Sequence, residues 1–386
     1  MIVMDYICEK FRNGKNRNMR NPFKYGAVVE GKFFTDRHKE LENIQRQIDS
    51  ENHLVLISPR RFGKTSLVVK AVKQSGRPSI SINFQKLVSV TDFAATVLKE
   101  LFKLHPWEKL KYEMSHFRVV PTISTNPMSD GVEVAFMPSV NASVALEDVF
   151  TLVDKLSSQD KKLIIVLDEF QEIMSLDKGV DKRLRAIMQE MGNVNFIILG
   201  SQESMMTEIM MTEIFERKRS PFYHFGLLMH LSKIPYSDFH QYIEERMPST
   251  NRIDNAVIAD QILSITSCHP YYTQQLSAQV WNILTYDLQD FGTNTEETGI
   301  VESAVRQLTE IHDLDFERIW QNLNNTDKRI MQTLCRGKRL VEGCSLPSST
   351  VYSAVKKLIK AGYIIRTEEY ELEDPFFRRW ITDNRI

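Results

Sequence analysis

The sequence predicts an α/β fold in which helices cover both faces of a parallel sheet. Apolar runs at residues 53–57, 163–167 and 196–199 are typical of buried strands, because a strand covered on both faces carries few polar side chains. The first run leads through a polar loop into an amphipathic segment and then into the strand-like segment SISINF. This strand–helix–strand succession favours a parallel sheet between helices.

The next part of the chain is predicted to contain a hairpin and a helical subdomain. Residues 92–102 have helical spacing, and residues 117–144 then break into two strand-like stretches around Asp130-Gly131, which predicts a hairpin insertion. From residue 236 to about residue 321, apolar residues recur at spacings of three and four. We expect a separate, mostly helical subdomain there.

The carboxyl-terminal segment has the layout of a winged helix. Thr326 is the predicted N-cap of one helix, Ser348 or Ser349 caps a second, and Gly362 ends that second helix. Two short strands are expected to follow. Helix, turn, helix and β-pair is the order of elements in a winged helix.

Composition excludes few functions. The chain has 386 residues, enough for two or three domains, and its formal net charge of −1 does not require a polyanionic partner. Its four cysteines lack the close spacing of a zinc or redox motif, which indicates reduced thiols in a cytoplasmic protein. Secretion and membrane insertion are disfavoured, because neither a basic leader nor an apolar run of about 20 residues is found. Basic residues gather at residues 10–24, where a solvated arm is favoured over a nucleic-acid contact.

A phosphate-binding loop is predicted between the first strand and the first helix. The stretch SPRRFGKT, residues 58–65, nearly matches the Walker A pattern, and its strand-to-helix context disfavours a chance GKT in a surface loop. Backbone amides of such a loop surround the β-phosphate at the positive end of the helix. Lys64 is expected to reach the β- and γ-phosphates, and Thr65 to ligate Mg²⁺. The expected nucleotide contacts are Ser58, Pro59, Arg60, Arg61, Phe62, Gly63, Lys64, Thr65 and Ser66.

Ser58 departs from this pattern, which has glycine at its first position. A glycine there normally permits a backbone conformation that a side chain penalises. Gly63, next to the lysine, is retained. We expect Ser58 to weaken the match to the pattern more than it weakens the predicted function.

Two carboxylates end the buried strand at residues 163–167. Asp168 and Glu169 lie at the carboxyl edge of the predicted sheet, where such sheets bind ligands. We expect Asp168 to hold Mg²⁺ and Glu169 to orient or deprotonate the attacking water. Two solvated carboxylates at a helix start are the simpler alternative, which the upstream loop disfavours. After the strand at 196–199, Ser201 or Gln202 is expected either to contact the γ-phosphate or to cap a helix.

In the order of its motifs, the chain resembles the AAA+ class of P-loop ATPases, in particular the archaeal-type group related to STAND signalling ATPases. The motifs are NPF, FFTDRHKEL, SPRRFGKTSL, LIIVLDEFQEI, ILGSQESMM, HPYYTQQL and DPFFRRWI. The resemblance implies a five-stranded sheet of order 5-1-4-3-2, a helical lid and a winged helix. We therefore expect a basic arm at residues 1–30, an ATPase domain at 31–233, a lid at 234–322 and a winged-helix domain at 323–386.

The resemblance implies further nucleotide contacts. Phe34 and Arg37 match a segment that lies against the adenine, although a packed aromatic and a surface arginine are equally consistent. His269, Pro270 and Tyr271 match the lid segment that faces the nucleotide. This segment lacks the arginine that many AAA+ proteins place against the γ-phosphate, which argues against sensing by the lid.

Two basic groups have more than one interpretation. Arg217 and Arg219 precede the fifth strand, where either could act as an arginine finger to a neighbouring subunit, but a solvated basic loop is favoured. Lysines in the winged helix could approach DNA phosphates, whereas glutamates on its predicted wing would repel them, so a docking or autoinhibitory role is favoured over DNA binding. The lysines are Lys356, Lys357 and Lys360, and the glutamates are Glu368, Glu369, Glu371 and Glu373.

The leading hypothesis is a switch that binds ATP with Mg²⁺, closes its lid on the nucleotide and is reset by slow hydrolysis. Its winged helix would pass the change to an unknown protein client. The alternative is a DNA-binding regulator that resembles archaeal origin-recognition proteins, holds ATP or ADP and has little or no turnover. A small-molecule kinase also uses a GKT loop, but the chain shows no acceptor-binding motif. The oligomeric state stays open.

Overall fold

The chain forms two compact units. The computed structural model describes residues 20–35, 37–125, 132–137, 139–158, 161–201, 218, 220–249, 254–287, 299–338, 340–344, 346–366 and 369–386. The sheet unit comprises Arg37–Ser232 and Tyr352–Glu371, and the helical unit comprises Met1–Asp36, Lys233–Val351 and Leu372–Ile386. Among the described residues, every helix is too short or too polar to cross a bilayer.

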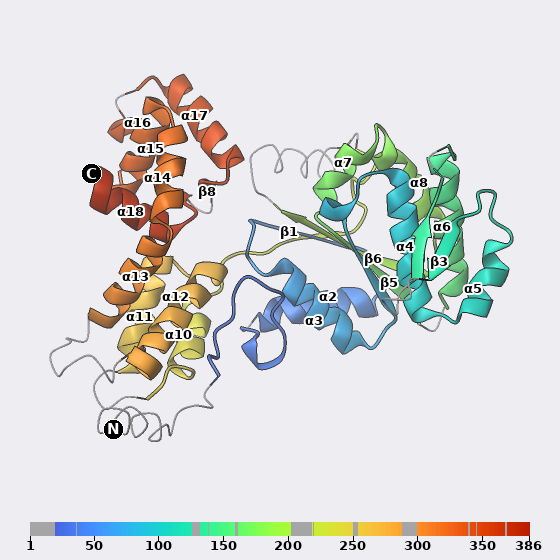
Figure 1. The fold of residues 1–386 in the computed structure, drawn as a ribbon, viewed down its shortest axis with the longest axis horizontal. Coiled ribbons are helices and arrows are strands. Elements are labelled where there is room, and N and C mark those ends of the chain that lie inside the picture. Colours follow the sequence, from blue (N-terminus) through green and yellow to red (C-terminus); the bar gives the residue numbers. More distant parts are fainter. Residues whose placement is uncertain are drawn as a thin grey trace, which may run out of the picture. The chain divides into compact units, whose positions relative to one another are not determined.

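A five-stranded parallel sheet forms the centre of the sheet unit, in the order β2-β5-β6-β1-β7 (Figure 1). Counted along the chain and taken from the β7 edge, its strands are the fifth, first, fourth, third and second. The central strands β1, β5 and β6 are buried at every position, as expected for strands that are covered on both faces. The five strands are β1 (Leu54–Ser58), β2 (Ser79–Asn83), β5 (Leu163–Asp168), β6 (Val194–Ser201) and β7 (Leu227–His230).

Helices cover both faces of this sheet (Figure 1). On one face lie α2 (His38–Asp49) and α3 (Lys64–Ser75), which contact each other. On the other lie α4 (Val90–Leu104), α6 (Ala142–Leu156) and α8 (Val180–Glu190), with α6 in contact with both α4 and α8. The predicted α/β fold with a parallel sheet is confirmed.

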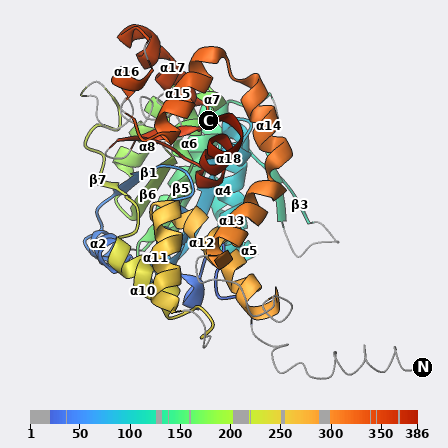
Figure 2. The same cartoon turned by 90° about the vertical axis from the view of Figure 1, so that its left-hand side faces the viewer.

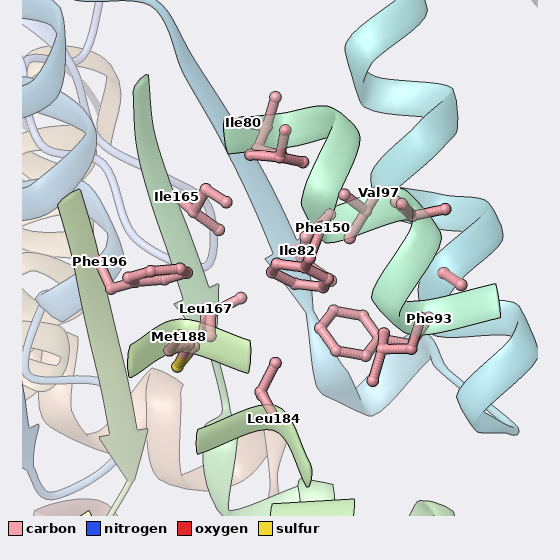
Figure 3. Close-up of a cluster of buried hydrophobic side chains, with 14 of the residues drawn as sticks. Ile80, Ile82, Phe93, Val97, Phe150, Ile165, Leu167, Leu184, Met188 and Phe196 are labelled. Carbon is pink, nitrogen blue, oxygen red and sulfur yellow. The ribbon is translucent and has the colours of Figure 1, made fainter. Parts of the chain in front are cut away.

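A large apolar core lies between the sheet and the helices of the second face (Figure 3). Residues two apart on a strand point to the same face, so each strand contributes alternate side chains to this core. Burying one large apolar side chain contributes about 1.5 to 3 kcal/mol, so this core holds the strand ends in fixed positions. Its members include Ile80, Ile82, Ile165, Leu167 and Phe196 from strands, Phe93 and Val97 from α4, Phe150 from α6, and Leu184 and Met188 from α8.

Polar caps begin two of the helices that build this core. Ser89 accepts a hydrogen bond from the Asp92 amide at 3.1 Å at the start of α4. Asn141 accepts from the amides of Ser143 and Val144 at 3.0 and 3.3 Å at the start of α6. Such side chains satisfy amides that have no partner in the first helical turn.

A short helix and a pair of strands lie between α4 and α6. The helix α5 (Trp107–Met114) is followed by β3 (Thr122–Thr125) and β4 (Val132–Ala135), which pair antiparallel with Thr122 opposite Ala135. The strand β4 contacts α4. The expected turn at Asp130-Gly131 lies outside the described residues.

Short helical turns follow β2 and β5 and also occur elsewhere in the chain. They are η1 (Gly31–Phe33), η2 (Phe84–Lys86), η3 (Phe170–Glu172) and α7 (Ile173–Leu176).

Helices account for most of the described part of the helical unit. The neighbouring helices α10, α11, α12 and α13 pack successively against one another (Figure 2). Their bounds, with those of the elements that follow them, are α10 (Tyr236–Glu244), α11 (Asn255–Thr266), α12 (Pro270–Asn282), the π-helical η4 (Ile283–Asp287), α13 (Gly299–Ile311) and α14 (Asp313–Asn322).

The carboxyl-terminal segment contains helices and one β-pair. Its elements are α15 (Asn325–Cys335), α16 (Leu340–Gly343), α17 (Ser348–Lys360), β8 (Ile364–Arg366), β9 (Tyr370–Leu372) and α18 (Pro375–Arg385), with β8 and β9 paired. Thr326 as the N-cap of α15 was wrong. Asn324 is the cap, because it and Asp327 form a reciprocal capping box in which each side chain accepts from the other's amide. Gly362 follows α17 with a φ of 76°, as its predicted role requires.

The last helix is anchored by aromatic side chains within the helical unit. Phe377 stacks on Phe316 with ring centroids 5.0 Å apart, and Trp380 meets Trp320 edge to face at 6.3 Å. The indole nitrogen of Trp380 donates to Asp313 at 2.7 Å. Phe376, Phe377 and Trp380 are therefore buried packing residues.

Candidate functional site

The loop between β1 and α3 has a backbone that suits a phosphate group. Arg61 and Gly63 have positive φ angles of 62° and 87°, and Gly63 is the N-cap residue that precedes α3. A Cβ at Gly63 would meet no atom within 4 Å, so the backbone angle and not crowding favours glycine there. Phe62 is buried and fixes the loop, whereas Arg60 and Arg61 are exposed. The loop is therefore exposed at Arg60, Arg61 and Gly63 and lies at the amino end of a helix, where anions bind.

Ser58 causes no strain in this loop. It is the last residue of β1, where it pairs with Ser201 of β6, and it is not among the described residues with positive φ. Its hydroxyl donates to the Pro59 carbonyl at 2.8 Å. The left-handed positions fall at Arg61 and Gly63 instead, so the missing first glycine does not distort the loop.

Lys64 crosses from α3 to the end of β6. Its Nζ donates to Ser201 Oγ at 2.9 Å and lies 3.4 Å from the Pro59 carbonyl oxygen. The lysine is only 5% exposed and Ser201 is fully buried. A buried ammonium is stable only with close partners or an anion. The Ser201 and Pro59 oxygens therefore hold Lys64 next to the phosphate loop.

Thr65 and Asp168 supply neighbouring oxygen atoms. Thr65 Oγ1 donates to Asp168 Oδ2 at 2.9 Å, which joins the first turn of α3 to the end of β5. Burial raises the pKa of Asp168 above its usual value and the charge of Glu169 adds to this, while the Thr65 hydrogen bond and Lys64 oppose it. A hydroxyl beside a carboxylate is a donor set that Mg²⁺ prefers, so the chemistry of these two residues fits that ion.

Glu169 is held by side chains from two elements. It adopts a left-handed conformation with φ 53°, uncommon for a residue other than glycine. Its Oε1 accepts from the Ser201 hydroxyl at 2.9 Å, and its Oε2 accepts from Gln171 Nε2 at 2.6 Å. Lys64, Thr65, Asp168, Glu169 and Ser201, which were predicted separately, thus form one connected group at the carboxyl edge of the sheet.

Gln171 belongs to this group and was missed in the sequence. Its side chain is 5% exposed and contacts both Glu169 and the backbone amide of Ser201. The available signal was a glutamine two residues beyond Glu169, in a turn that follows a buried strand. Sequence alone could not show that the turn brings this side chain back toward β6.

Arg37, the N-cap residue of α2, contacts the same loop. Its guanidinium donates to Glu40 at 2.8 Å and to the Phe62 carbonyl at 3.2 Å, and the residue is buried. The alternative of a surface arginine was therefore wrong. Ser66, in the first turn of α3, is buried as well.

The remaining predicted contacts lie in the helical unit or outside the described residues. His269 is the N-cap of α12 and accepts from the Tyr271 amide at 3.2 Å, with Pro270 as the first helical residue. Thr35, next to Phe34, accepts from Gln274 of α12 at 2.8 Å. The structure thus places Phe34, His269, Pro270 and Tyr271 in one unit and the phosphate loop in the other. Gln202, Arg217 and Arg219 lie outside the described residues.

The comparison with protein families decides the assignment. A model of an ATPase domain that occurs predominantly in Archaea matches residues 34–276. The chain belongs to this family. The match includes the phosphate loop, both strand-end carboxylates and Ser201, so this archaeal-type ATPase domain contains the whole connected group. The predicted membership of the P-loop ATPases is confirmed.

Several solved structures are similar to this chain at low sequence identity. A Walker-type ATPase of Pyrococcus abyssi is 14% identical, with a TM-score of 0.62, and the match covers 94% of this chain and 99% of that one. The ORC1 protein of Aeropyrum pernix, solved in complex with DNA, is 12% identical with a TM-score of 0.49, covering 93% and 94%. The RuvB protein of Thermotoga maritima is 14% identical with a TM-score of 0.45, covering 90% and 95%. No curated protein matches the chain.

Proposed function

We propose that this ATPase domain binds ATP with Mg²⁺ and hydrolyses it slowly, as a molecular switch of the AAA+/STAND type. One observation carries the proposal: the Thr65–Asp168 bond at 2.9 Å lies beside a lysine, a serine and a glutamate that are themselves hydrogen bonded in series. A purely structural cluster does not require a loop with two left-handed residues at the helix start next to it. These groups are the ones that phosphoryl transfer needs.

Each residue has a separate part in this proposal. Residues 58–66 hold the phosphates of ATP through backbone amides and Lys64, and Thr65 and Asp168 hold Mg²⁺. When bound, Mg²⁺ neutralises charge on the phosphate oxygens. Glu169 accepts a proton from the attacking water, and the oxygen of that water bonds to the γ-phosphorus. The bond between the γ-phosphorus and the bridging oxygen breaks, which releases ADP. Ser201 helps to position the attacking water, because its hydroxyl donates to Glu169.

The adenine and the lid complete the proposed switch. Phe34 and Arg37 flank the adenine, and His269, Pro270 and Tyr271 face the nucleotide from a lid at residues 234–322. Thr35 is hydrogen bonded to Gln274 in the lid helix α12, which supports a coupled movement of the Phe34 segment with the lid. A winged-helix domain at 323–386 passes the change to a protein client.

A DNA-binding regulator with little turnover is the second candidate. Lys356, Lys357 and Lys360 are exposed on α17, which supports a contact with DNA phosphates. The glutamates on the predicted wing argue against DNA binding because they would repel phosphates. Glu373 weakens this objection, because it accepts a hydrogen bond from the Tyr272 hydroxyl at 2.5 Å.

Phosphate release separates the two candidates. The parent and Glu169→Gln are assayed with ATP at millimolar Mg²⁺, with and without duplex DNA. We expect the parent to release phosphate about 100-fold faster than the variant or more, since a positioned base contributes at least that factor. A parent no faster than Glu169→Gln removes the hydrolysis proposal. DNA binding that is lost when the three α17 lysines are changed to alanine would then favour the regulator.

A further inference from the structure

The turn after β5 is fixed by the core. Phe170, the first residue of η3, is fully buried, and its ring meets Phe84 and Phe222 edge to face, each at 5.3 Å. Glu169 precedes it in a left-handed conformation, and Gln171 follows it. Because the ring between them cannot move without disturbing the core, the backbone of both polar residues is held in place.

Gln171 uses both ends of its amide within the site. Its Oε1 accepts from the Ser201 backbone amide at 3.3 Å, and its Nε2 donates to Glu169 Oε2 at 2.6 Å. The orientation of the amide is fixed by chemistry, because a backbone N–H can only donate and a carboxylate can only accept. Gln171 therefore bridges η3, β6 and Glu169 with one donor and one acceptor.

Both oxygens of Glu169 are held as a result. The Ser201 hydroxyl has a single proton, which it gives to Glu169 Oε1, and it accepts from the Lys64 ammonium. Gln171 holds the other oxygen. Among the described residues, charged groups near this carboxylate include Lys64, joined to it through Ser201, and Asp168, its neighbour in the chain.

We propose that Gln171 is a positioning residue that sets the carboxylate of Glu169 for its task as the base of ATP hydrolysis. This inference rests on the function proposed above. Packing alone does not require an amide at this place, since an apolar side chain of similar volume would fill it without needing two buried partners. The amide supplies what an apolar residue cannot: a donor for one carboxylate oxygen and a link to the strand that carries Ser201.

The chain contains a matched control. Gln85 occupies the same place in η2 as Gln171 in η3, the second position of a three-residue turn that begins with a core phenylalanine and follows a strand of the same sheet. Gln85 is exposed, whereas Gln171 is buried. A change at Gln85 thus reproduces the local sequence effect without disturbing Glu169.

The test uses the full chain and five substitutions measured in parallel. Gln171→Met removes both arms at similar volume, and Gln171→Glu keeps the acceptor for Ser201 but replaces the donor with a like charge. Gln85→Met and Gln85→Glu are the controls, and each Gln171 change is also combined with Glu169→Gln. The readouts are the kcat and KM of phosphate release, the Kd of ADP with Mg²⁺, and the melting temperature.

We expect both Gln171 variants to lower kcat by about 10- to 100-fold, because a catalytic group displaced by about 1 Å loses up to that factor. The Kd of ADP stays within about twofold, since the hydrogen bonds of the Gln171 side chain go to Glu169 and Ser201, outside residues 58–66. The Gln85 variants match the parent. In the Glu169→Gln background the Gln171 changes have no further effect on kcat, because they act only through that carboxylate.

The possible failures can be told apart. A parent without phosphate release removes the proposed function, and Gln171 then has no base to position. An active parent with Gln171 variants of equal kcat overturns this inference alone. A loss of kcat that persists in full in the Glu169→Gln background also overturns it. So does a loss of kcat accompanied by an equal loss of ADP affinity, since either result indicates general damage to the fold.

Discussion

Thr65 of α3 and Asp168 of β5 are joined by a hydrogen bond of 2.9 Å although 103 residues separate them in the chain. The bond connects the start of the phosphate-loop helix to the tip of a buried strand. It also brings together a hydroxyl and a carboxylate, oxygen ligands that suit Mg²⁺. The parallel register that pairs Asn83 with Asp168 and Ser58 with Ser201 places the other strand ends at the same edge.

Removing the Thr65 hydroxyl tests this arrangement. We expect Thr65→Ala to lower Mg²⁺-dependent phosphate release at least tenfold, because one oxygen of the pair is lost and Asp168 loses its hydrogen bond. Thr65→Ser keeps the hydroxyl and should retain most of the activity. A titration of phosphate release with Mg²⁺ measures the effect. Equal Mg²⁺ dependence in parent and Thr65→Ala contradicts this assignment.

Lys64 gives a second prediction, concerned with binding. Lys64→Met should weaken ATP binding by at least tenfold at equilibrium, since the loop loses the charge that Ser201 now orients. Lys73→Met is a suitable control, because Lys73 lies exposed in the last turn of the same helix. Calorimetry with a slowly hydrolysed ATP analogue measures both. Undiminished affinity in Lys64→Met would show that the phosphates bind elsewhere.

The sequence was informative where a residue's role depends on its neighbours in the chain. The apolar runs predicted the buried strands, and GKT and the DE pair predicted Lys64, Thr65, Asp168 and Glu169, because each lies directly next to a strand end or helix start. The parallel sheet was predicted from the alternation of strand-like and helical segments along the chain. These predictions needed only local spacing and the rule that parallel strands end at one edge.

The sequence was uninformative where the role depends on a distant segment. Gln171 and Arg37 both reach groups that the fold alone brings near, Ser201 for the first and the Phe62 carbonyl for the second. The Thr326 cap failed for a local reason, since an asparagine two residues earlier has an aspartate three positions after it and forms the stronger capping box. The preference for glycine at the first loop position matters only where φ is positive, and Ser58 is not among the described residues with a positive φ.

Tyr272 gives a prediction for the helical unit. Its hydroxyl donates to Glu373, the residue that precedes the cap of α18, and its ring meets Phe376 edge to face at 5.9 Å. Tyr272→Phe keeps the ring contact and removes the hydrogen bond, which should cost about 1.5 to 3 kcal/mol because the acceptor is charged. The free energy of unfolding in urea measures the loss.

The control for Tyr272 is an exposed tyrosine of the same unit. Tyr286→Phe serves, because Tyr286 is exposed and contacts Trp281 through its ring at 5.7 Å. It should change the free energy of unfolding by less than about 0.5 kcal/mol. Equal stability of Tyr272→Phe and the parent would show that the Tyr272–Glu373 bond contributes nothing to holding α18.

His53 predicts a dependence of stability on pH. Its ring stacks on Phe225 at 4.5 Å, and its Nδ1 accepts from the Phe196 amide at 3.3 Å. Burial, with the charges of Arg185 and Lys162, lowers the pKa of His53 from 6.5 to about 4. His53 is therefore protonated less readily in the folded chain than in the unfolded chain. The contribution of neutral His53 to the free energy of unfolding is full above pH 6.5 and is lost as the pH falls toward 4. After discounting for partial exposure, the loss is about 2 kcal/mol.

Urea unfolding at pH 7, 6, 5 and 4.5 measures the slope of the free energy of unfolding against pH. The His53→Phe variant isolates the part of that slope that His53 contributes. The variant keeps a ring against Phe225 but cannot take a proton, so it should be less stable than the parent at pH 7, where the Phe196 amide loses its acceptor, and should lose less stability on acidification. His105, whose pKa burial also lowers, leaves part of the slope in place. His116→Phe, at an exposed histidine whose ring meets Tyr112 edge to face, is the control substitution. If His53→Phe and the parent lose equal stability between pH 7 and 4.5, His53 is not the group that the fold keeps neutral.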